Sequence, residues 1–151
     1  MDLKFVKNTA DLDDLLNHLI RNDLEFTPKL SSRVQMDLYS EKIFENADRY
    51  EVFFNNSLSG LIAVYKTMDR WHITSVSVDR SLRGSGVAGR LLGALIEDGR
   101  RTSPAIQLEV NQKAAQAISL YTRLGFRIKN SEDDILFMEF DYCREEEDEK
   151  L

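Results

Sequence analysis

The chain has 151 residues, 42% of them hydrophobic, and a formal net charge of −6, which favours one compact domain and argues against a general nucleic-acid-binding protein. No apolar run reaches the roughly 20 residues that a membrane-spanning helix needs, so we expect no membrane partner. The first residues lack the apolar stretch of a secretory signal, and the single Cys143 disfavours disulfides and zinc clusters, so we expect a cytoplasmic protein without a bound metal.

The spacing of apolar residues predicts the first elements. Residues Leu3 to Val6 form the first expected strand, and Thr9 is the expected cap of the helix that follows. The apolar residues that then recur on one helical face are Leu12, Leu15, Leu16, Leu19 and Ile20. His18 lies off this face, so we expect it at the surface without a catalytic role.

Residues 22–33 are expected to be irregular, because Pro28 cannot occupy the interior of a helix. A second helix is predicted to follow and to end near Asn46, with Ser31 or Ser32 as its cap. The residues that share one face of this helix are Met36, Tyr39, Ile43 and Ala47. Their spacing predicts that most of them pack in the core.

Three strands are predicted next, at residues 50–54, 58–66 and 71–78. Short turns separate them at residues 55–57, where asparagines tolerate a left-handed backbone, and at residues 68–70. Strands that are joined by such short turns form an antiparallel meander.

The third strand leads into a glycine-rich turn and a helix that is expected to end near Arg101. The elements predicted after it are a strand at 105–110, a helix at 113–123, and two strands at 126–129 and 134–140. Gly125 is the expected C-cap of the last helix. Residues 142–151 form an acidic tail, so a single domain is expected over residues 1–141.

The stretch between residues 83 and 90 carries the strongest functional signal. Its glycines, Gly84, Gly86 and Gly89, lack β-carbons, so a ligand can approach the backbone closely. A helix that begins directly after such a turn points unpaired N–H groups and the positive end of its dipole at whatever lies there. These features favour an anion, most often a phosphate, and predict a diphosphate-binding site.

Two common phosphate-binding motifs fit this stretch poorly. The glycines match the dinucleotide-binding pattern G-x-G-x-x-G, and Glu109 follows at about the required 20 residues. That pattern should directly follow a buried parallel strand and be accompanied by several βα units, whereas residues 79–82 intervene here and too little chain follows Gly89. A P-loop is excluded because no Gly-Lys-Ser or Gly-Lys-Thr follows the glycines.

A third pattern fits better. The segment Arg83-Gly-Ser-Gly-Val-Ala88 follows a strand and opens a helix, and a second block contains Leu108-Glu-Val-Asn111 and Leu120-Tyr-Thr-Arg-Leu-Gly-Phe126. The two blocks together resemble the GNAT superfamily of acetyl-CoA-dependent acyltransferases. The resemblance covers residues 50–141 and implies an α+β fold: a mixed, mostly antiparallel central sheet of about six or seven strands flanked by about four helices.

The resemblance implies acetyl-CoA as the cosubstrate. The backbone N–H groups of the glycine-rich loop are expected to hold the CoA diphosphate, and Arg83 and Arg90 can add positive charge. The residues of this loop are Gly84, Ser85, Gly86, Val87, Ala88 and Gly89. This expectation agrees with the diphosphate site that the glycines predict by themselves.

The strand before the loop has a second role in the family, because its backbone pairs with the pantetheine arm of CoA. Here that strand contributes Val76, Ser77 and Val78, and a backbone N–H at this place can polarise the acetyl carbonyl. The strand at 105–110 is expected to splay away and open a slot for CoA. Asn111 is expected to contact CoA there, and it can also cap the next helix.

The resemblance also makes Tyr121 the predicted proton donor to the leaving CoA thiolate. Free tyrosine and thiol groups have pKa values near 10 and 8.5, so a phenol can hydrogen-bond to a sulfur and protonate it. The helical spacing of Tyr121 with Ala114, Ala117 and Ile118 also fits a packed core tyrosine. The second motif favours the catalytic interpretation.

The sequence does not identify a general base. The candidates are Glu51, His72 and Glu109, and water alone is a fourth possibility. Deprotonating a lysine-like amine of pKa near 10.4 at pH 7 costs about 4.6 kcal/mol, whereas an amine of pKa near 8 costs only about 1.4 kcal/mol. The second kind of amine can react through a water molecule without a dedicated base.

The acceptor is expected to enter over residues 26–39, with Thr27, Ser31, Arg33 and Tyr39 as polar contacts. The first part of this segment is similar to those in family members tied to bacterial surface-sugar biosynthesis, which favours an amino sugar. The predicted reaction is N-acetylation of a small-molecule primary amine by a monomer or homodimer. O-acetylation of a sugar hydroxyl and a non-catalytic acyl-CoA-binding module stay open as alternatives.

Overall fold

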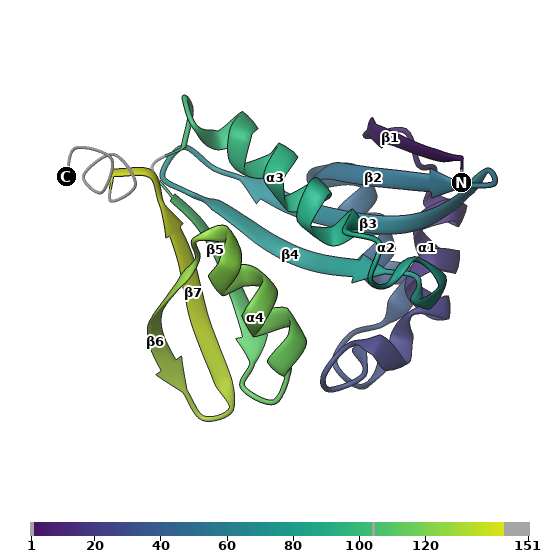
Figure 1. Ribbon diagram of the computed structural model, residues 1–151. Coiled ribbons are helices and arrows are strands. Elements are labelled where there is room, and N and C mark those ends of the chain that lie inside the picture. The colour runs from purple at the N-terminus through teal and green to yellow at the C-terminus, as the bar shows by residue number, and fades with distance from the viewer. Residues whose placement is uncertain (1, 104, 144–151) are drawn as a thin grey trace.

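The computed structural model describes residues 2–103 and 105–143, which form one central sheet with helices on both faces (Figure 1). Its strands have the spatial order β1-β2-β3-β4-β5-β7-β6. Their bounds are β1 Leu3–Lys7, β2 Asp48–Phe54, β3 Ser57–Lys66, β4 Trp71–Val78, β5 Ala105–Asn111, β6 Arg127–Glu132 and β7 Ile135–Asp141. The α-helices of the described residues are α1 Leu12–Arg21, α2 Met36–Asn46, α3 Val87–Gly99 and α4 Ala115–Leu124. The predicted α+β fold is confirmed.

Neighbouring strands are antiparallel throughout the sheet except for β4 and β5, which run parallel. This parallel ladder contains two residue pairs, Trp71 with Ile106 and His72 with Gln107. Beyond His72 the two strands diverge, and Figure 1 shows them running apart from a common region. The predicted splaying of residues 105–110 from the preceding strand is therefore confirmed.

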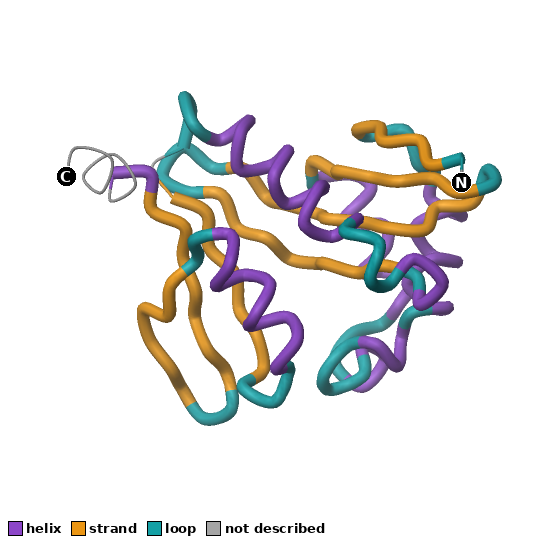
Figure 2. The backbone as a smooth tube through the Cα atoms, viewed as in Figure 1, coloured by secondary structure: helices purple, strands orange, loops and turns teal. Residues whose placement is uncertain are grey.

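The helices cover opposite faces of the sheet (Figure 2), and the buried side chains form two hydrophobic cores. α3 packs on β2, β3, β4 and β5, and its residues Leu92 and Leu95 are fully buried in the larger core. α1 packs on α2 and β3, where Leu19 and Ile43 are fully buried in the second core beside Leu61. Each such side chain stabilises the fold by about 1.5–3 kcal/mol relative to its exposed state.

α1 is capped by Asp11, so the prediction of Thr9 as its cap is wrong. The Asp11 carboxylate accepts the Asp14 N–H at 2.8 Å, and the Asp14 carboxylate accepts the Asp11 N–H at 3.0 Å. This reciprocal pair satisfies two donors that a helix start leaves unpaired. Thr9 instead donates its N–H and its hydroxyl to Glu51 of β2, a contact that no local pattern indicates.

His18 is fully buried, so its predicted surface position is wrong. α1 lies against the sheet, and residues beside its apolar stripe also face inward. The sheet provides a partner for each ring nitrogen, because the Leu58 carbonyl lies 3.1 Å from Nδ1 and the Ser77 hydroxyl lies 2.8 Å from Nε2. A buried polar side chain is tolerated when its hydrogen bonds are made in this way.

α2 begins at Met36, and no side chain of the described residues caps it. The predicted caps, Ser31 and Ser32, lie in a separate 3-10 helix, Leu30–Ser32. Ser31 donates its N–H and its hydroxyl to the Asp23 carboxylate. The prediction of a serine cap is therefore wrong, because the serine side chains brace the irregular segment before the helix.

The other predicted elements are present with small shifts at their ends. Gly125 has a φ of 110° and ends α4 as the predicted C-cap, whereas α3 ends at Gly99, before the predicted Arg101. Of the predicted acidic tail, residues 144–151 lie outside the described residues, and Tyr142 is buried against Phe140. None of the helices in residues 2–103 and 105–143 has the length and apolar content to cross a membrane.

Candidate active site

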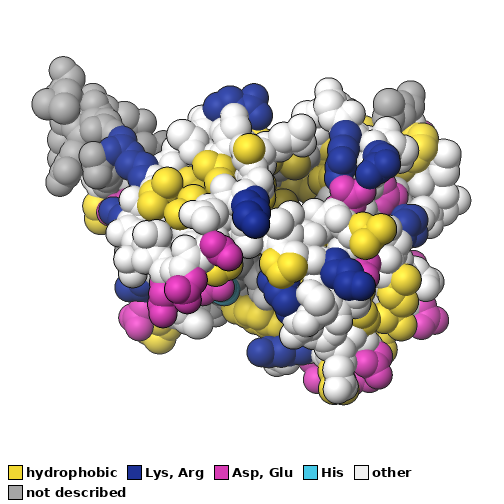
Figure 3. Space-filling view, turned by 90° about the horizontal axis from the view of Figure 1, so that it is seen from below, with side chains coloured by type: hydrophobic (Ala, Val, Ile, Leu, Met, Phe, Trp, Pro, Cys, Tyr) yellow, Lys and Arg dark blue, Asp and Glu magenta, His cyan; other side chains and the backbone are white. Residues whose placement is uncertain are grey.

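A pocket of about 290 Å³ lies where β4 and β5 separate. Its wall is formed by β4 at residues 72–76, β5 at residues 108–111, side chains of α4, and parts of the segment 25–39, which ends in the first turn of α2. Figure 3 views the molecule from the side to which β4 and β5 diverge, and acidic, basic and hydrophobic side chains are interspersed on that face. The pocket thus joins the edge of β4 to the segment predicted to bind the acceptor.

The glycine-rich loop before α3 keeps its backbone accessible. Gly84 and Gly86 have φ values of 77° and 82°, in the left-handed region that glycine adopts without strain. A β-carbon added at either position would meet nothing within 4 Å, and no side chain among the described residues caps the start of α3. The first N–H groups of α3, with the positive end of the helix dipole, are therefore available to an anion, and the loop fits a diphosphate.

The two arginines beside this loop make contacts with other parts of the protein. Arg83 forms an ion pair with Glu25, whose carboxylate also lies 3.3 Å from Arg80. The guanidinium of Arg90 lies over the Phe5 ring, 3.8 Å from its centroid, in a cation–π contact. Arg83 therefore links the loop to the acceptor side, whereas Arg90 is held over β1.

The backbone of β4 presents one edge to the slot. On its other edge, Val76, Ser77 and Val78 pair with β3. Towards β5 the ladder ends at His72, so no strand of the described residues pairs with residues 76–78 on that side. An extended molecule can bind such an edge through main-chain hydrogen bonds, as an added strand does.

A bulge in β4 lies in the pocket wall. Thr74 has no partner in β3, between the paired residues Ile73 and Ser75. The Tyr39 hydroxyl of α2 donates to the Thr74 carbonyl at 2.9 Å. The Ser75 hydroxyl is buried and has no hydrogen-bond partner in the part of the chain that the structure describes.

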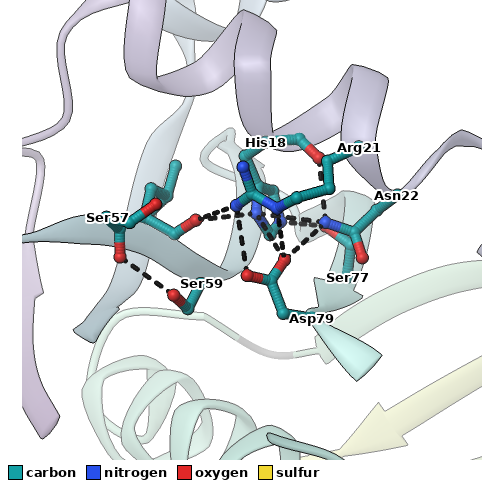
Figure 4. A network of polar contacts seen from close by, with 8 residues as sticks. His18, Arg21, Asn22, Ser57, Ser59, Ser77 and Asp79 are labelled. Atoms are coloured by element: carbon teal, nitrogen blue, oxygen red, sulfur yellow. Dashed lines mark hydrogen bonds and ion pairs between the residues drawn. The ribbon is translucent and has the colours of Figure 1, made fainter. Parts of the chain in front are cut away.

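A polar network ties the end of β4 to α1 (Figure 4). Because Nδ1–H of His18 donates to a β3 carbonyl, its Nε2 accepts from the Ser77 hydroxyl at 2.8 Å. Asn22 and Arg21 donate to the Asp79 carboxylate at 2.8 Å and 3.1 Å. The network fixes the backbone directly before the glycine-rich loop.

Replacement of Asp79 by asparagine is expected to lower the free energy of unfolding by about 2 kcal/mol at pH 7. Burial alone would raise the pKa of Asp79, but the His18 ring, whose Nδ1 lies 3.5 Å from the carboxylate, and hydrogen bonds from Asn22 and Arg21 outweigh it and lower the pKa from 3.8 to about 2. The folded state therefore binds this proton more weakly than the unfolded chain. The stabilisation is full above about pH 4 and is lost as the pH falls to about 2.

Urea unfolding of the wild type and of Asp79→Asn at pH 7 and at about pH 2.5 measures this effect. Asp69→Asn is the control, because Asp69 is exposed in the turn between β3 and β4. We expect this control to match the wild type at both pH values. A stability difference for Asp79→Asn that is as large in acid as at pH 7 would contradict the role of the carboxylate charge.

Tyr121 extends from α4 into the pocket wall. Its side chain is 6% exposed, and its ring packs against Phe126 with the centroids 5.9 Å apart. Burial raises the pKa of the hydroxyl to about 12, so the phenol keeps its proton at physiological pH. The ring packs as a core tyrosine does, and the same side chain is placed to contact a bound ligand.

The three candidate bases lie in different environments. Glu51 is fully buried, lies 2.9 Å from the Arg49 guanidinium and accepts the Thr9 N–H at 2.8 Å. It is not part of the pocket wall, so the hypothesis that Glu51 is the base is wrong. His72 is half-buried and Glu109 is exposed, and both line the pocket.

The structure also brings residues of the predicted acceptor side together. Thr27, Arg33 and Tyr39 line the pocket, and Ser31 does not. Asn111 lines the pocket as well, and its side-chain oxygen accepts the backbone N–H two residues later at 2.9 Å. Within the described residues no group of three or more His, Cys, Asp or Glu side chains is placed to hold a metal ion.

Glu25 and Ser75 also line the pocket, and neither is among the site residues predicted from the sequence. The alternation along β4 could not have found Ser75, because it shares a face with Ser77, which bonds to His18 and is not part of the pocket wall. Glu25 carries no local signal. It is presented by a 3-10 helix, Asp23–Glu25, in a segment that the sequence marks only as irregular.

Comparison with known proteins identifies the family. The chain matches the model of the acetyltransferase (GNAT) family over residues 13–126. A search of curated protein sequences found no significant match. Among solved structures, the ribosomal-protein-S18-alanine N-acetyltransferase from Escherichia coli is similar, with 18% identity, a TM-score of 0.76, and coverage of 93% of this chain and 94% of that one.

Two further structures share the fold. The PaiA N-acetyltransferase from Thermoplasma acidophilum, in complex with coenzyme A, has 15% identity, a TM-score of 0.74, and coverage of 94% of this chain and 100% of that one. An aminoglycoside 6′-acetyltransferase type Ii has 16% identity, a TM-score of 0.74, and coverage of 94% and 97%. Because the family match spans most of the chain, the protein belongs to the GNAT family of acetyltransferases, acyltransferases that use acetyl-CoA.

Proposed function

We propose that this protein transfers the acetyl group of acetyl-CoA to a primary amine of a small molecule, by direct attack within a ternary complex. The observation that carries the proposal is the pocket between β4 and β5, which the edge of β4 and the segment 25–39 both line. One part of its wall is the β4 edge with Tyr121, where we expect the thioester. The opposite part is the segment 25–39, so an amine bound there can reach the thioester without a covalent enzyme intermediate.

Each part of CoA is assigned to a different part of the chain. Backbone N–H groups of residues 84–89 are proposed to hold the diphosphate, with Arg83 beside them. An exposed helix dipole contributes only about 0.3–1 kcal/mol, so several hydrogen bonds must supply most of the binding. The edge of residues 76–78 is proposed to pair with the pantetheine arm, Asn111 to contact CoA from β5, and a β4 N–H to polarise the acetyl carbonyl.

Tyr121 is proposed to donate a hydrogen bond to the sulfur as it leaves. With a pKa of about 12, early transfer of its proton to a thiolate of pKa about 8.5 is uphill by roughly 5 kcal/mol. The phenol therefore acts first by stabilising the developing negative charge. The proton that the attacking amine loses balances the proton that the thiol finally gains.

An amino sugar is the proposed acceptor. Thr27, Arg33 and Tyr39 give the pocket polar groups that suit sugar hydroxyls, and the buried Ser75 hydroxyl has no partner within the described residues. A structural relative is an aminoglycoside 6′-acetyltransferase, and aminoglycosides contain amino sugars. The mixture of charges around the pocket also suits a polar acceptor better than an apolar one.

Acetyl-CoA consumption with glucosamine, spermidine and alanine amide tests the proposal. We expect glucosamine to be acetylated, and the product to resist hydroxylamine as an amide does. A product that hydroxylamine cleaves would show O-acetylation instead. Turnover with spermidine or alanine amide alone would move the acceptor to another class of amine, and the absence of turnover with all three would contradict a small-amine acceptor.

We infer one acetyltransferase domain over residues 1–141, because the sheet runs continuously from β1 to β7. We further propose a cytoplasmic protein that is a monomer or homodimer and binds neither nucleic acid nor membranes. Light scattering of the purified protein measures its mass in solution.

We propose Glu109 as the general base, acting directly or through water, because it is an exposed carboxylate in the pocket wall. Glu109→Gln is expected to lower kcat/KM about 10²-fold for an amine of pKa near 10. The loss should be smaller for an amine of pKa near 8, which needs little help to lose its proton. Rates with such a pair of amines across a pH range measure the difference.

His72→Gln is the matched comparison, since His72 is the second candidate base in the pocket wall. We expect this variant to retain the dependence of rate on amine pKa that Glu109→Gln loses. An equal loss for both amines in Glu109→Gln would assign Glu109 to acceptor binding. A larger and amine-dependent loss in His72→Gln would make the histidine the base.

A further inference from the structure

Glu25 connects the cofactor side of the site to the acceptor side. It is the last residue of the 3-10 helix Asp23–Glu25, and it lines the pocket. Its Oε2 is paired with Arg83 and its Oε1 lies 3.3 Å from Arg80. Arg83 directly precedes Gly84, the first glycine of the loop. One carboxylate therefore lies between the expected diphosphate and the expected amine.

The pair between Glu25 and Arg83 is well placed to be exchanged. The two side chains are 23% and 46% exposed, and ion pairs in contact with water are weak and easily replaced. A diphosphate carries more charge than a carboxylate, and the fork of an arginine binds phosphate oxygens through two parallel hydrogen bonds. We therefore expect CoA to compete with Glu25 for Arg83. Once Arg83 has left it, the negative charge of the Glu25 carboxylate repels the nearby diphosphate and so opposes CoA binding.

We propose that Glu25 changes partners when CoA binds. In the CoA-free enzyme it holds Arg83, and once the diphosphate takes Arg83, Oε2 of Glu25 accepts a hydrogen bond from the ammonium group of the acceptor. Arg80, whose side chain is 80% exposed, can stay on Oε1. The acceptor is therefore a cation when it binds, and it binds after CoA. The part that concerns the amine rests on the proposed function, whereas the part that concerns Arg83 depends on CoA binding alone.

Glu25→Gln tests the first part, because the amide keeps the shape of the side chain and removes its charge. Calorimetry is expected to give a roughly fivefold lower Kd for CoA, since Arg83 is released and a like charge is removed. Glu97→Gln is the control. Glu97 is paired with Arg100 at 3.3 Å near the C-terminal end of α3, so this variant also removes one carboxylate charge from an arginine. It should leave the Kd for CoA unchanged.

The same measurement in an Arg83→Gln background shows whether Arg83 carries the effect. There the gain from Glu25→Gln should fall below about twofold. Glu25→Ala removes the charge in a second way and must change the Kd in the same direction as Glu25→Gln. A Kd for CoA that is unchanged or higher in these variants, or a full gain without Arg83, would overturn the exchange.

The second part is tested by titrating glucosamine, spermidine and alanine amide into the CoA-loaded wild type and the CoA-loaded Glu25→Gln variant. We expect an amine that binds the wild type to bind the variant about fivefold more weakly, the opposite direction to the change for CoA. A purely structural role for Glu25 would weaken both ligands. Equal amine binding to both proteins, or no amine binding to the CoA-loaded wild type, would overturn this part. Acetyl transfer by the wild type judges the proposed function separately.

Discussion

Tyr121→Phe is expected to lower kcat about 10²-fold, while the Kd for CoA stays within about twofold of the wild type. The substitution removes the hydroxyl and keeps the ring that packs on Phe126, so the pocket wall is preserved. Because the pKa of about 12 keeps the wild-type hydroxyl protonated, its deprotonation should reduce the rate only above about pH 11. Single-turnover kinetics measure the chemical step apart from product release.

Tyr142 provides a matched control, because its hydroxyl donates to the Ile96 carbonyl at 2.5 Å and is not part of the pocket wall. Tyr142→Phe should lower the melting temperature and leave the single-turnover rate unchanged. A Tyr121→Phe enzyme that kept the wild-type single-turnover rate would show that Tyr121 is a core tyrosine only. The hydrogen bond to the leaving sulfur would then come from another donor.

Gly86→Glu is expected to raise the Kd for CoA about 10³-fold or more. A β-carbon added at Gly86 would meet nothing within 4 Å, so we expect the glutamate to extend into the space that we assign to the diphosphate. Two like charges about 4 Å apart repel by roughly 4 kcal/mol at an effective dielectric constant near 20, which corresponds to about 10³-fold in Kd. Calorimetry with CoA measures the change.

Gly86→Gln separates this charge effect from the backbone effect. Both variants place a side chain at a φ of 82°, where the left-handed backbone costs a residue with a β-carbon about 1–2 kcal/mol. The two side chains have the same size, so the glutamate variant should bind CoA about 10³-fold more weakly than the glutamine variant. Equal Kd values for the two variants would mean that the diphosphate lies away from this loop.

The loop and the strand before it could be predicted because their signals are local. The glycines and the first turn of α3 are consecutive in the chain, and the alternation along residues 71–78 marks a strand with the bounds that the structure has. The slot between β4 and β5 is different. No property of residues 105–110 alone indicates that they leave the neighbouring strand, and the prediction came from the resemblance to a family.

Two of the errors concern contacts between residues far apart in the chain. Thr9 was predicted as a cap, but the carboxylate of Glu51, 42 positions later, takes its N–H. His18 was placed at the surface by the helical pattern, yet its ring partners lie 40 and 59 positions away. A helical pattern shows which residues are apolar. It does not show which polar groups of the sheet can hydrogen-bond to the polar residues of the helix.

The short ladder between β4 and β5 has a consequence for how this enzyme can evolve. Hydrogen bonds hold paired strands about 4.8 Å apart, but these two strands are held in this way at only two residue pairs. Past His72 their separation depends on the packing of side chains in the larger core, such as Leu92 of α3 and Leu108 of β5. Substitutions in that layer can widen or narrow the opening while the glycine-rich loop stays intact. A lineage can thus acquire new acceptors and keep its acetyl donor.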